Sequence, residues 1–246
     1  LPQVLDWISL NQPDVLCLQE AKQNNDSFPH DVFEKRGLFS YHNGQNTYNG
    51  VAIISNKELI DVQFDIPNFY DEQKRLISGI YPNDEDPKFR VISAYIPNGQ
   101  SLNSDKFEYK MNWLKSFINF LQTKIDGIEN IITGDFNIAP STLDCYDSKS
   151  WDGKILVSPQ EREYFDKLLN LGFIDTFREI NPYANEFSWW DYRIPFKRNL
   201  GMRIDHILLS KTLLPFLKKA YIDKATRTLE RPSDHVPVVT ELSLNP

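Results

Sequence analysis

A short polar motif at the end of an apolar run is the strongest constraint on the fold of this chain. Residues 134–137 read Gly-Asp-Phe-Asn and closely follow the apolar pair Ile131 and Ile132. In a buried strand, Asp135 and Asn137 lie on one face, because strand side chains alternate with a period of two. An acid and an amide at a strand end can hold a hard cation and a water together, which suits hydrolysis. The Asp-x-Asn pattern also forms ordinary turns, so it needs support from other segments.

Apolar runs of strand length alternate with helical patterns along the chain. Strands are expected at residues 15–18, 51–54, 91–96, 207–209 and 236–239. Helices are expected from Leu1 to Pro13, from about Lys106 to Ile125, and from the capping box at Ser158 through Leu171. No repeat or linker interrupts the sequence, so we predict a single domain over residues 1–246. Several strand pairs without an intervening helix favour a layered α/β (α+β) domain with mixed sheets.

Composition bears on the compartment and the partner. The net charge of −7 argues against a polyanionic partner, but a metal-dependent phosphoesterase needs a carboxylate cluster in its site, so nucleic acid is not excluded. Cys17 and Cys145 give no disulfide framework and suit a reducing cytoplasm. No apolar run approaches the ~20 residues of a membrane span, and no signal segment opens the sequence. We therefore expect a cytoplasmic protein with no membrane segment.

Five polar clusters lie at the edges of apolar runs. They are Gln19-Glu20, Tyr95 with Asn98, Asp135 with Asn137, Arg203 with Asp205, and Ser233-Asp234-His235. Taken singly, Glu20 reads as a solvated carboxylate, Tyr95 as a packing residue and His235 as a structural histidine. Asp205 lies inside a strand pattern, where an unpaired ionised carboxylate is costly and requires a partner or a metal. The joint occurrence of the five clusters favours one hydrolytic site.

Seven motifs occur in an order typical of one enzyme family. They are residues 18–20 (Leu-Gln-Glu), 48–52 (Tyr-Asn-Gly-Val-Ala), 95–99 (Tyr-Ile-Pro-Asn-Gly), 134–137 (Gly-Asp-Phe-Asn), 187–193 (Phe-Ser-Trp-Trp-Asp-Tyr-Arg), 201–205 (Gly-Met-Arg-Ile-Asp) and 233–235 (Ser-Asp-His). In this respect the chain resembles the exonuclease III / AP endonuclease family of the endonuclease/exonuclease/phosphatase superfamily, in its bacterial exodeoxyribonuclease III form. The Trp-rich segment and the Gly-x-Arg-x-Asp motif are the more specific to the DNA repair branch. The resemblance implies a four-layer α/β sandwich, with two mixed sheets face to face and helices outside.

The resemblance also implies a divalent cation, usually Mg²⁺ or Mn²⁺. Its metal-site residues are Glu20, Asp135, Asn137, Asp234 and His235. Oxygen ligands of this kind suit a hard cation that keeps several waters.

Catalytic roles follow from the same resemblance. Asp135 would orient or deprotonate the attacking water, and Asn137 would hold Asp135 or the transition-state oxygens. His235, steadied by Asp205, would contact the scissile phosphate, to which Tyr95 would donate a hydrogen bond. A cation and fixed donors stabilise the transition state more than the ground state, because charge builds on the phosphoryl oxygens.

Duplex DNA with abasic sites or 3′ ends is the partner that the resemblance implies, for a protein expected to act as a monomer. Trp189, Met202 and Ile204 match the apolar pocket for a base-free deoxyribose. Further DNA contacts are expected from Lys22, Arg75, Asn98, Lys106 and Arg203.

One departure from the family pattern concerns the start of the chain. The family begins with a strand bearing an Asn-x-Asn/Asp-Gly-x-Arg motif, whereas Leu1 falls inside the helix expected after that strand. The resemblance therefore implies a domain whose N-terminal strand is missing, through fragmentation or true shortening.

Three functions compete on this sequence. The favoured one is a DNA repair nuclease that cuts at abasic sites and trims 3′ ends. A non-catalytic or impaired DNA-binding remnant is one alternative, because a catalytic asparagine belongs to the missing strand. The other is a related phosphodiesterase acting on lipid or inositol phosphates, against which the Trp-rich and Gly-x-Arg-x-Asp motifs argue.

Overall fold

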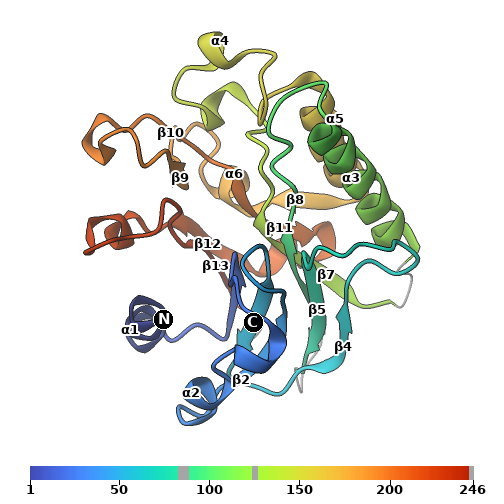
Figure 1. Ribbon diagram of the computed structural model, residues 1–246, viewed down its shortest axis with the longest axis vertical. Helices are drawn as coiled ribbons and strands as arrows, with labels where there is room; N and C mark the ends of the chain where they lie inside the picture. Colours follow the sequence, from blue (N-terminus) through green and yellow to red (C-terminus); the bar gives the residue numbers. More distant parts are fainter. Residues whose placement is uncertain (83–88, 124–126, 244–246) are drawn as a thin grey trace.

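A six-stranded sheet runs through the middle of the molecule in the computed structural model, which describes residues 1–82, 89–123 and 127–243 (Figure 1). Its strands, in spatial order, are β4 (Ile60–Phe64), β5 (Leu76–Tyr81), β6 (Phe89–Tyr95), β7 (Glu129–Asp135), β11 (Asp205–Ser210) and β8 (Phe173–Asp175). β6 and β7 are parallel, and the other neighbouring pairs are antiparallel. The sheet is therefore mixed, as predicted. β5 and β6 are buried on both faces, which explains their nearly continuous apolar sequences.

A second sheet of three strands departs from the prediction. In the order β1-β3-β2 it consists of β1 (Val15–Gln19), β3 (Val51–Ser55) and β2 (Phe39–Asn43). Both of its pairs are antiparallel, so this sheet is not mixed among the described residues. β2 returns directly to its neighbour β3, whereas β1 and β2 are joined through η1 and α2 and lie on either side of β3.

The alternation of side chains along β3 joins three layers. Val51 and Ile53 point to the six-stranded sheet, where they share a core with Ile77. Ala52 and Ile54 point the other way and pack against two helices. These helices are α1 (Pro2–Asn11) and α2 (His30–Glu34). The three-stranded sheet therefore lies between α1 and α2 on one side and the six-stranded sheet on the other.

Two long helices cover the opposite face of the six-stranded sheet (Figure 1). They are α3 (Asp105–Thr123) and α5 (Pro159–Asn170). The capping box predicted at Ser158 is confirmed: its hydroxyl accepts from the Glu161 amide, and the Glu161 carboxylate accepts from the Ser158 amide. α3 begins one residue before the predicted Lys106, and its predicted end at Ile125 lies outside the described residues.

The remaining elements are short. They are α4 (Ser148–Trp151), α6 (Thr176–Ile180), β9 (Trp189–Trp190), β10 (Gly201–Met202), β12 (Leu217–Ile222), β13 (Val238–Leu242) and the 3₁₀ helices η1 (Asn25–Ser27), η2 (Thr142–Asp144), η3 (Phe196–Arg198), η4 (Lys211–Phe216) and η5 (Lys224–Thr228). The strand predicted at residues 236–239 begins later, because Pro237 has no N–H and the Val236 amide donates to the carbonyl of Ser188 instead. Within the described ranges, no helix has the length and apolar character needed to cross a bilayer.

Candidate active site

Three strands of the six-stranded sheet bring polar residues to one edge. β6 and β7 run parallel, and Tyr95 is the register partner of Asp135. β11 runs antiparallel to β7, so it begins where β7 ends, and Asp205 is the register partner of Asp135 on the other side. Directly paired residues share one face of a sheet, so the three side chains lie side by side.

A histidine from outside the sheet completes this group. His235 Nδ1 lies 2.9 Å from Oδ2 and 3.0 Å from Oδ1 of Asp205, and its Nε2 lies 4.0 Å from Oδ2 of Asp135. Burial disfavours a charged imidazole, but the charge and hydrogen bond of Asp205 outweigh burial and raise the pKa of His235 to about 10. His235 is therefore a fixed cation at neutral pH, with Nε2–H directed to the side of Asp135.

Asp135 is buried and held by Asn137. The Asn137 amide N–H donates to Oδ1 of Asp135 at 2.8 Å, and its side-chain Nδ2 donates to Oδ2 at 3.0 Å. Asn137 has a left-handed backbone (φ 50°), which asparagine tolerates better than most residues and which turns both donors toward the acid. Burial, opposed in part by the charge of His235, raises the pKa of Asp135. Its carboxylate is thus more basic than usual, which favours proton acceptance.

Glu20 reaches the same edge from the three-stranded sheet. It follows β1 in a left-handed conformation (φ 56°). Its Oε1 accepts the Tyr95 hydroxyl at 2.5 Å, and its Oε2 pairs with Lys22 Nζ at 2.8 Å. Burial alone would raise the pKa of Glu20, but the bonds from Lys22 and Tyr95 outweigh it and lower that pKa. Glu20 is therefore held as a carboxylate.

The donor set fits a divalent cation. Asp135, Asp205 and His235 each place one ligand atom within 4.8 Å of the others. The carboxylates of Asp135 and Asp205 offer the oxygen ligands that a hard cation prefers, whereas His235, kept protonated by Asp205, offers none. Among the described residues this compact group does not include Glu20 or Asp234, two of the predicted metal ligands.

Comparisons with known proteins agree with this geometry. The family profile described as "Endonuclease/Exonuclease/phosphatase family" matches residues 2–235. Exodeoxyribonuclease III of Haemophilus influenzae is 37% identical over 244 residues, covering 94% of this chain and 90% of that protein. The chain belongs to the exonuclease III / AP endonuclease family. It is an exodeoxyribonuclease III-like phosphodiesterase.

Two solved structures of the family superpose closely on this chain. The 3′ phosphatase NExo from Neisseria, bound to a product DNA hairpin, is 41% identical with a TM-score of 0.94, covering 98% of this chain and 93% of that one. An AP endonuclease from Archaeoglobus fulgidus is 33% identical with a TM-score of 0.92 and the same coverage.

The residues predicted for the family's apolar pocket lie together but differ in exposure. Trp189 on β9 is the register partner of Met202 on β10, and both share a cluster with Ile204. Met202 and Ile204 are fully buried, so they pack behind Trp189 and are not accessible from solvent. Trp189 is half-buried, and its Nε1 donates to Oδ2 of Asp234 at 3.1 Å. Among the three, Trp189 is thus the one with exposed surface.

Two arginines predicted to contact DNA, Arg75 and Arg203, are buried in the structure. Arg203 is 1% exposed, and its guanidinium is bound by Asp144 at 2.7 Å and by Asp175 at 2.7 and 3.1 Å. Arg75 is also buried; it donates to the Tyr95 carbonyl at 3.1 Å and lies 4.7 Å over the Tyr95 ring. A guanidinium already bound by carboxylates or by a stacked tyrosine is not free for a phosphate. Arg75 instead orients Tyr95.

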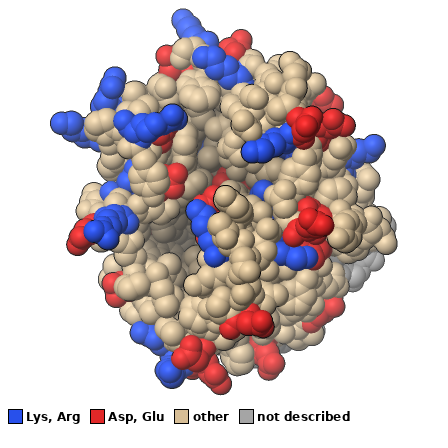
Figure 2. Space-filling model, viewed as in Figure 1, with Lys and Arg blue, Asp and Glu red and all other residues tan. Residues whose placement is uncertain are grey.

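Lys22, Asn98 and Lys106 are exposed. Figure 2 shows a hollow near the middle of one face of the molecule, with acidic atoms deep within it and Lys and Arg side chains around it. Acidic groups at the bottom of the hollow and Lys and Arg at its rim are compatible with a polyanionic partner despite the net charge of −7.

Sequence reasoning missed Ser188. This buried hydroxyl donates to Oδ2 of Asp205 at 2.6 Å and accepts from the amides of Ile204 and Asp205 at 3.1 Å. It therefore fixes the carboxylate that charges His235. The sequence did offer a signal, because Ser188 is a small polar residue between the aromatic residues Phe187 and Trp189.

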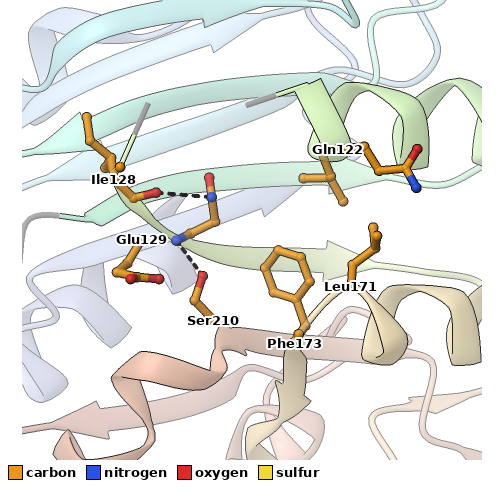
Figure 3. Close-up of a pocket in the computed structure, with 10 residues that line it drawn as sticks. Gln122, Ile128, Glu129, Leu171, Phe173 and Ser210 are labelled. Carbon is orange, nitrogen blue, oxygen red and sulfur yellow. Dashed lines mark hydrogen bonds between the residues drawn. The ribbon is translucent and has the colours of Figure 1, made fainter. Parts of the chain in front are cut away.

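A second hollow lies far from these groups. It has a volume of about 440 Å³ and is lined by residues that include Glu129, Phe173 and Ser210 (Figure 3). Glu129 is the first residue of β7, whereas Asp135 is the last. The catalytic group and this hollow are therefore at opposite ends of the same strand.

Proposed function

We propose that this chain is a divalent-metal-dependent DNA repair nuclease that hydrolyses phosphodiesters at abasic sites and at 3′ ends of duplex DNA. The observation that carries the proposal is the Asp205–His235 ion pair beside Asp135 at one edge of the sheet. This edge combines a basic carboxylate, a fixed cation and the half-buried Trp189. The relatives described as exodeoxyribonuclease III and AP endonuclease support the two activities.

Mg²⁺ or Mn²⁺ is the proposed cofactor. Glu20 and Asp135 would hold it, with Asn137, Asp234 and His235 nearby. Carboxylate and amide oxygens are the ligands that such cations prefer. When bound, the cation neutralises charge that develops on the phosphoryl oxygens.

The protein's own groups divide the remaining work of hydrolysis. Asp135 accepts a proton from the attacking water as the water oxygen bonds to phosphorus, and Asn137 keeps that carboxylate in place. The phosphorus–oxygen bond to the leaving sugar breaks, and the released oxygen takes a proton from solvent. His235 and Tyr95 donate hydrogen bonds to phosphoryl oxygens, while Asp205 keeps His235 charged. His235 is preorganised by Asp205 and so favours the more highly charged transition state, whereas the Tyr95 hydroxyl, which donates to Glu20 in the structure, would turn to the phosphate.

Substrate recognition rests on the rim of the site. Trp189 would pack against a base-free deoxyribose, backed by Met202 and Ile204. Lys22, Lys106 and Asn98 would contact backbone phosphates, which position a duplex without reading its sequence.

Removal of a 3′ phosphate is a second candidate activity. The observation that favours it is the close match to NExo, which is described as a 3′ phosphatase. The same water activation and phosphoryl contacts serve a terminal monoester, because the attacked atom is again phosphorus.

The order of the layers supports a single layered domain. We infer a single domain over residues 1–246 in which the helices and sheets form a four-layer sandwich. Apolar contacts link α1 and α2, the three-stranded sheet, the six-stranded sheet, and α3 with α5 in that order. A monomer acting in the cytoplasm is consistent with a DNA substrate and with the free thiols of Cys17 and Cys145.

Cleavage assays on labelled duplexes test the proposal. One duplex carries an abasic site, one a recessed 3′-hydroxyl end and one a 3′ phosphate. We expect cleavage of the first two in Mg²⁺ and none after chelation with EDTA. Glu20→Gln is expected to shift the Mg²⁺ titration to higher concentration and to lower turnover, whereas Glu34→Gln, at an exposed acid of α2, is expected to change neither.

Three other outcomes would redirect the assignment. Activity confined to the 3′-phosphate duplex would identify a phosphatase. Tight binding to abasic duplex without cleavage in Mg²⁺ would identify a non-catalytic DNA-binding protein. Preference for inositol phosphates or phospholipids over every duplex would identify the lipid or inositol alternative.

A further inference from the structure

A fully buried ion pair lies directly behind the catalytic edge. Lys110 on α3 and Glu161 on α5 both have side chains that are 0% exposed, and they form an ion pair with each other. Around this pair, the helices contact the sheet through a large apolar cluster that includes Trp113 and Phe165. Removing two charges from water costs several kcal/mol per ion, so an apolar pair at this position would suit helix packing at least as well. Helix packing alone therefore does not explain the pair.

The ammonium group also binds the backbone of two catalytic loops. Lys110 Nζ donates to the carbonyl of Asn137 at 2.8 Å and to the carbonyl of Asn98 at 3.2 Å. With Glu161 as the third acceptor, all three ammonium protons are used. Asn98 follows β6 and Asn137 follows β7, so Lys110 ties together the loops that leave two adjacent parallel strands.

The side chains on those loops meet at the site. Asn98 Nδ2 donates to Oδ1 of Asn137 at 2.8 Å, and Asn137 Nδ2 donates to Oδ2 of Asp135 at 3.0 Å. Gly99, in a left-handed conformation (φ 88°), lets the lysine stem pass: a Cβ there would lie 3.1 Å from Lys110 Cδ. The Lys110 ammonium therefore holds the backbone of Asn137, and the side chain of Asn137 holds the carboxylate of Asp135.

Glu161 extends the connection to the substrate pocket. Its Oε1 accepts from the Leu156 amide at 3.0 Å, and its Oε2 accepts from Ser158 at 2.6 and 3.0 Å. Leu156 belongs to the apolar cluster that contains Met202 and Trp189. One carboxylate thus anchors both the lysine and the segment that backs Trp189.

We propose that Lys110 is a positioning residue for phosphodiester hydrolysis: held by Glu161, it fixes the carbonyls of Asn98 and Asn137 and so directs their amide side chains toward Asp135 and the phosphate. The proposal rests on the nuclease function proposed above. Small misplacements of catalytic groups are costly to the chemical step, whereas binding to a long duplex depends on many contacts. Loss of the ammonium should therefore lower kcat and leave KM nearly unchanged.

Two variants test this role: Glu161→Gln removes only the counterion, and Lys110→Met with Glu161→Gln removes the whole ion pair. Glu161→Gln removes the carboxylate that holds Lys110 and leaves the ammonium buried without a counterion, so we expect kcat on abasic duplex to fall in this variant as well. Lys110→Met combined with Glu161→Gln removes the ammonium without leaving a buried charge. We expect its kcat to fall at least about tenfold with KM within about twofold, and Lys110→Arg to recover most of the loss.

The matched control is the exposed pair Lys167–Glu163 on the same helix α5. Lys167→Met with Glu163→Gln should leave kcat, KM and the melting temperature unchanged. A folded Lys110→Met/Glu161→Gln protein with wild-type kcat would overturn the proposal. If that double variant does not fold, Lys110→Gln/Glu161→Gln replaces it, and wild-type kcat there has the same meaning. A wild-type protein that cleaves no duplex would overturn the nuclease function itself, and this proposal with it.

Discussion

At the scale of single residues, the chemistry depends on a charge held in place by its neighbour. Asp205 lies in the sheet register beside Asp135, accepts hydrogen bonds from Ser188 and His235, and keeps His235 cationic. Asp205 and His235, which are 30 residues apart in the sequence, become one unit because β11 and the loop before β13 meet at the same edge. The role proposed for His235 therefore depends on its partner Asp205.

Asp205→Asn tests that pair. The amide keeps the size of the side chain but removes the negative charge, so the pKa of His235 should fall toward its ordinary value. We expect single-turnover cleavage to slow by roughly 100-fold with little change in DNA affinity measured in EDTA. The control is Asp31→Asn, in an exposed surface pair. Collapse of binding with a normal chemical step would show that Asp205 is structural.

Trp189→Ala tests substrate choice. An abasic sugar lacks its base and fits beside the indole, whereas an intact nucleotide collides with it. We expect the ratio of kcat/KM on abasic and intact duplexes to fall by about tenfold, with a smaller change in overall DNA binding. Trp7→Ala, at the indole that donates to Asp223 on the side of α1, is the control. An unchanged ratio would mean that Trp189 only packs.

At the scale of elements, a buried network connects the strands that carry the site. Arg203, between β10 and β11, binds Asp144 at the end of η2 and Asp175 at the end of β8. Asp144 also pairs with Arg178 of α6. This network fixes the segment between Met202 and Asp205, and so sets the register on which both the pocket and the catalytic acid depend.

Arg203→Met should therefore destabilise the whole fold. The substitution leaves two buried carboxylates short of a partner, and we expect a loss of about 3 to 5 kcal/mol in the free energy of unfolding by urea denaturation. Lys219→Met breaks an exposed pair with Glu241 and should cost less than about 1 kcal/mol. Weaker DNA binding at unchanged stability would instead restore Arg203 as a phosphate contact.

At the scale of the whole molecule, buried neutral histidines link stability to pH. Burial, reinforced by the charge of Arg203, lowers the pKa of His206 from 6.5 to about 4. Its neutral ring accepts from Arg203 at 3.0 Å and donates to the Ile138 carbonyl at 2.9 Å. Between about pH 4 and 6.5 the unfolded chain binds a proton that the folded chain excludes, so stability falls as the pH falls through this window.

His206→Gln should reduce that acid sensitivity. Glutamine keeps a donor and an acceptor but does not titrate, and the other titrating groups are common to both proteins. We expect the loss of unfolding free energy between about pH 7 and pH 5 to be about 2 kcal/mol smaller in the variant. The matched control is His30→Gln, which makes the same replacement at an exposed histidine. Equal pH dependence in wild type and His206→Gln would show that His206 does not titrate in this range.

The sequence by itself determined what depends on neighbours along the chain. The capping box at Ser158 and most of the expected strands follow from local periodicity and hydrogen bonding, and the structure confirms them, although the last strand begins only at Val238. Asn137 lies beyond β7 and reaches Asp135 through a left-handed turn, not through the alternation of a strand. The tertiary structure decided which polar groups are buried. Arg203 meets Asp144 across 59 residues of chain, and Lys110 meets Glu161 across 51. Burial depends on contacts between distant segments, which no local pattern encodes.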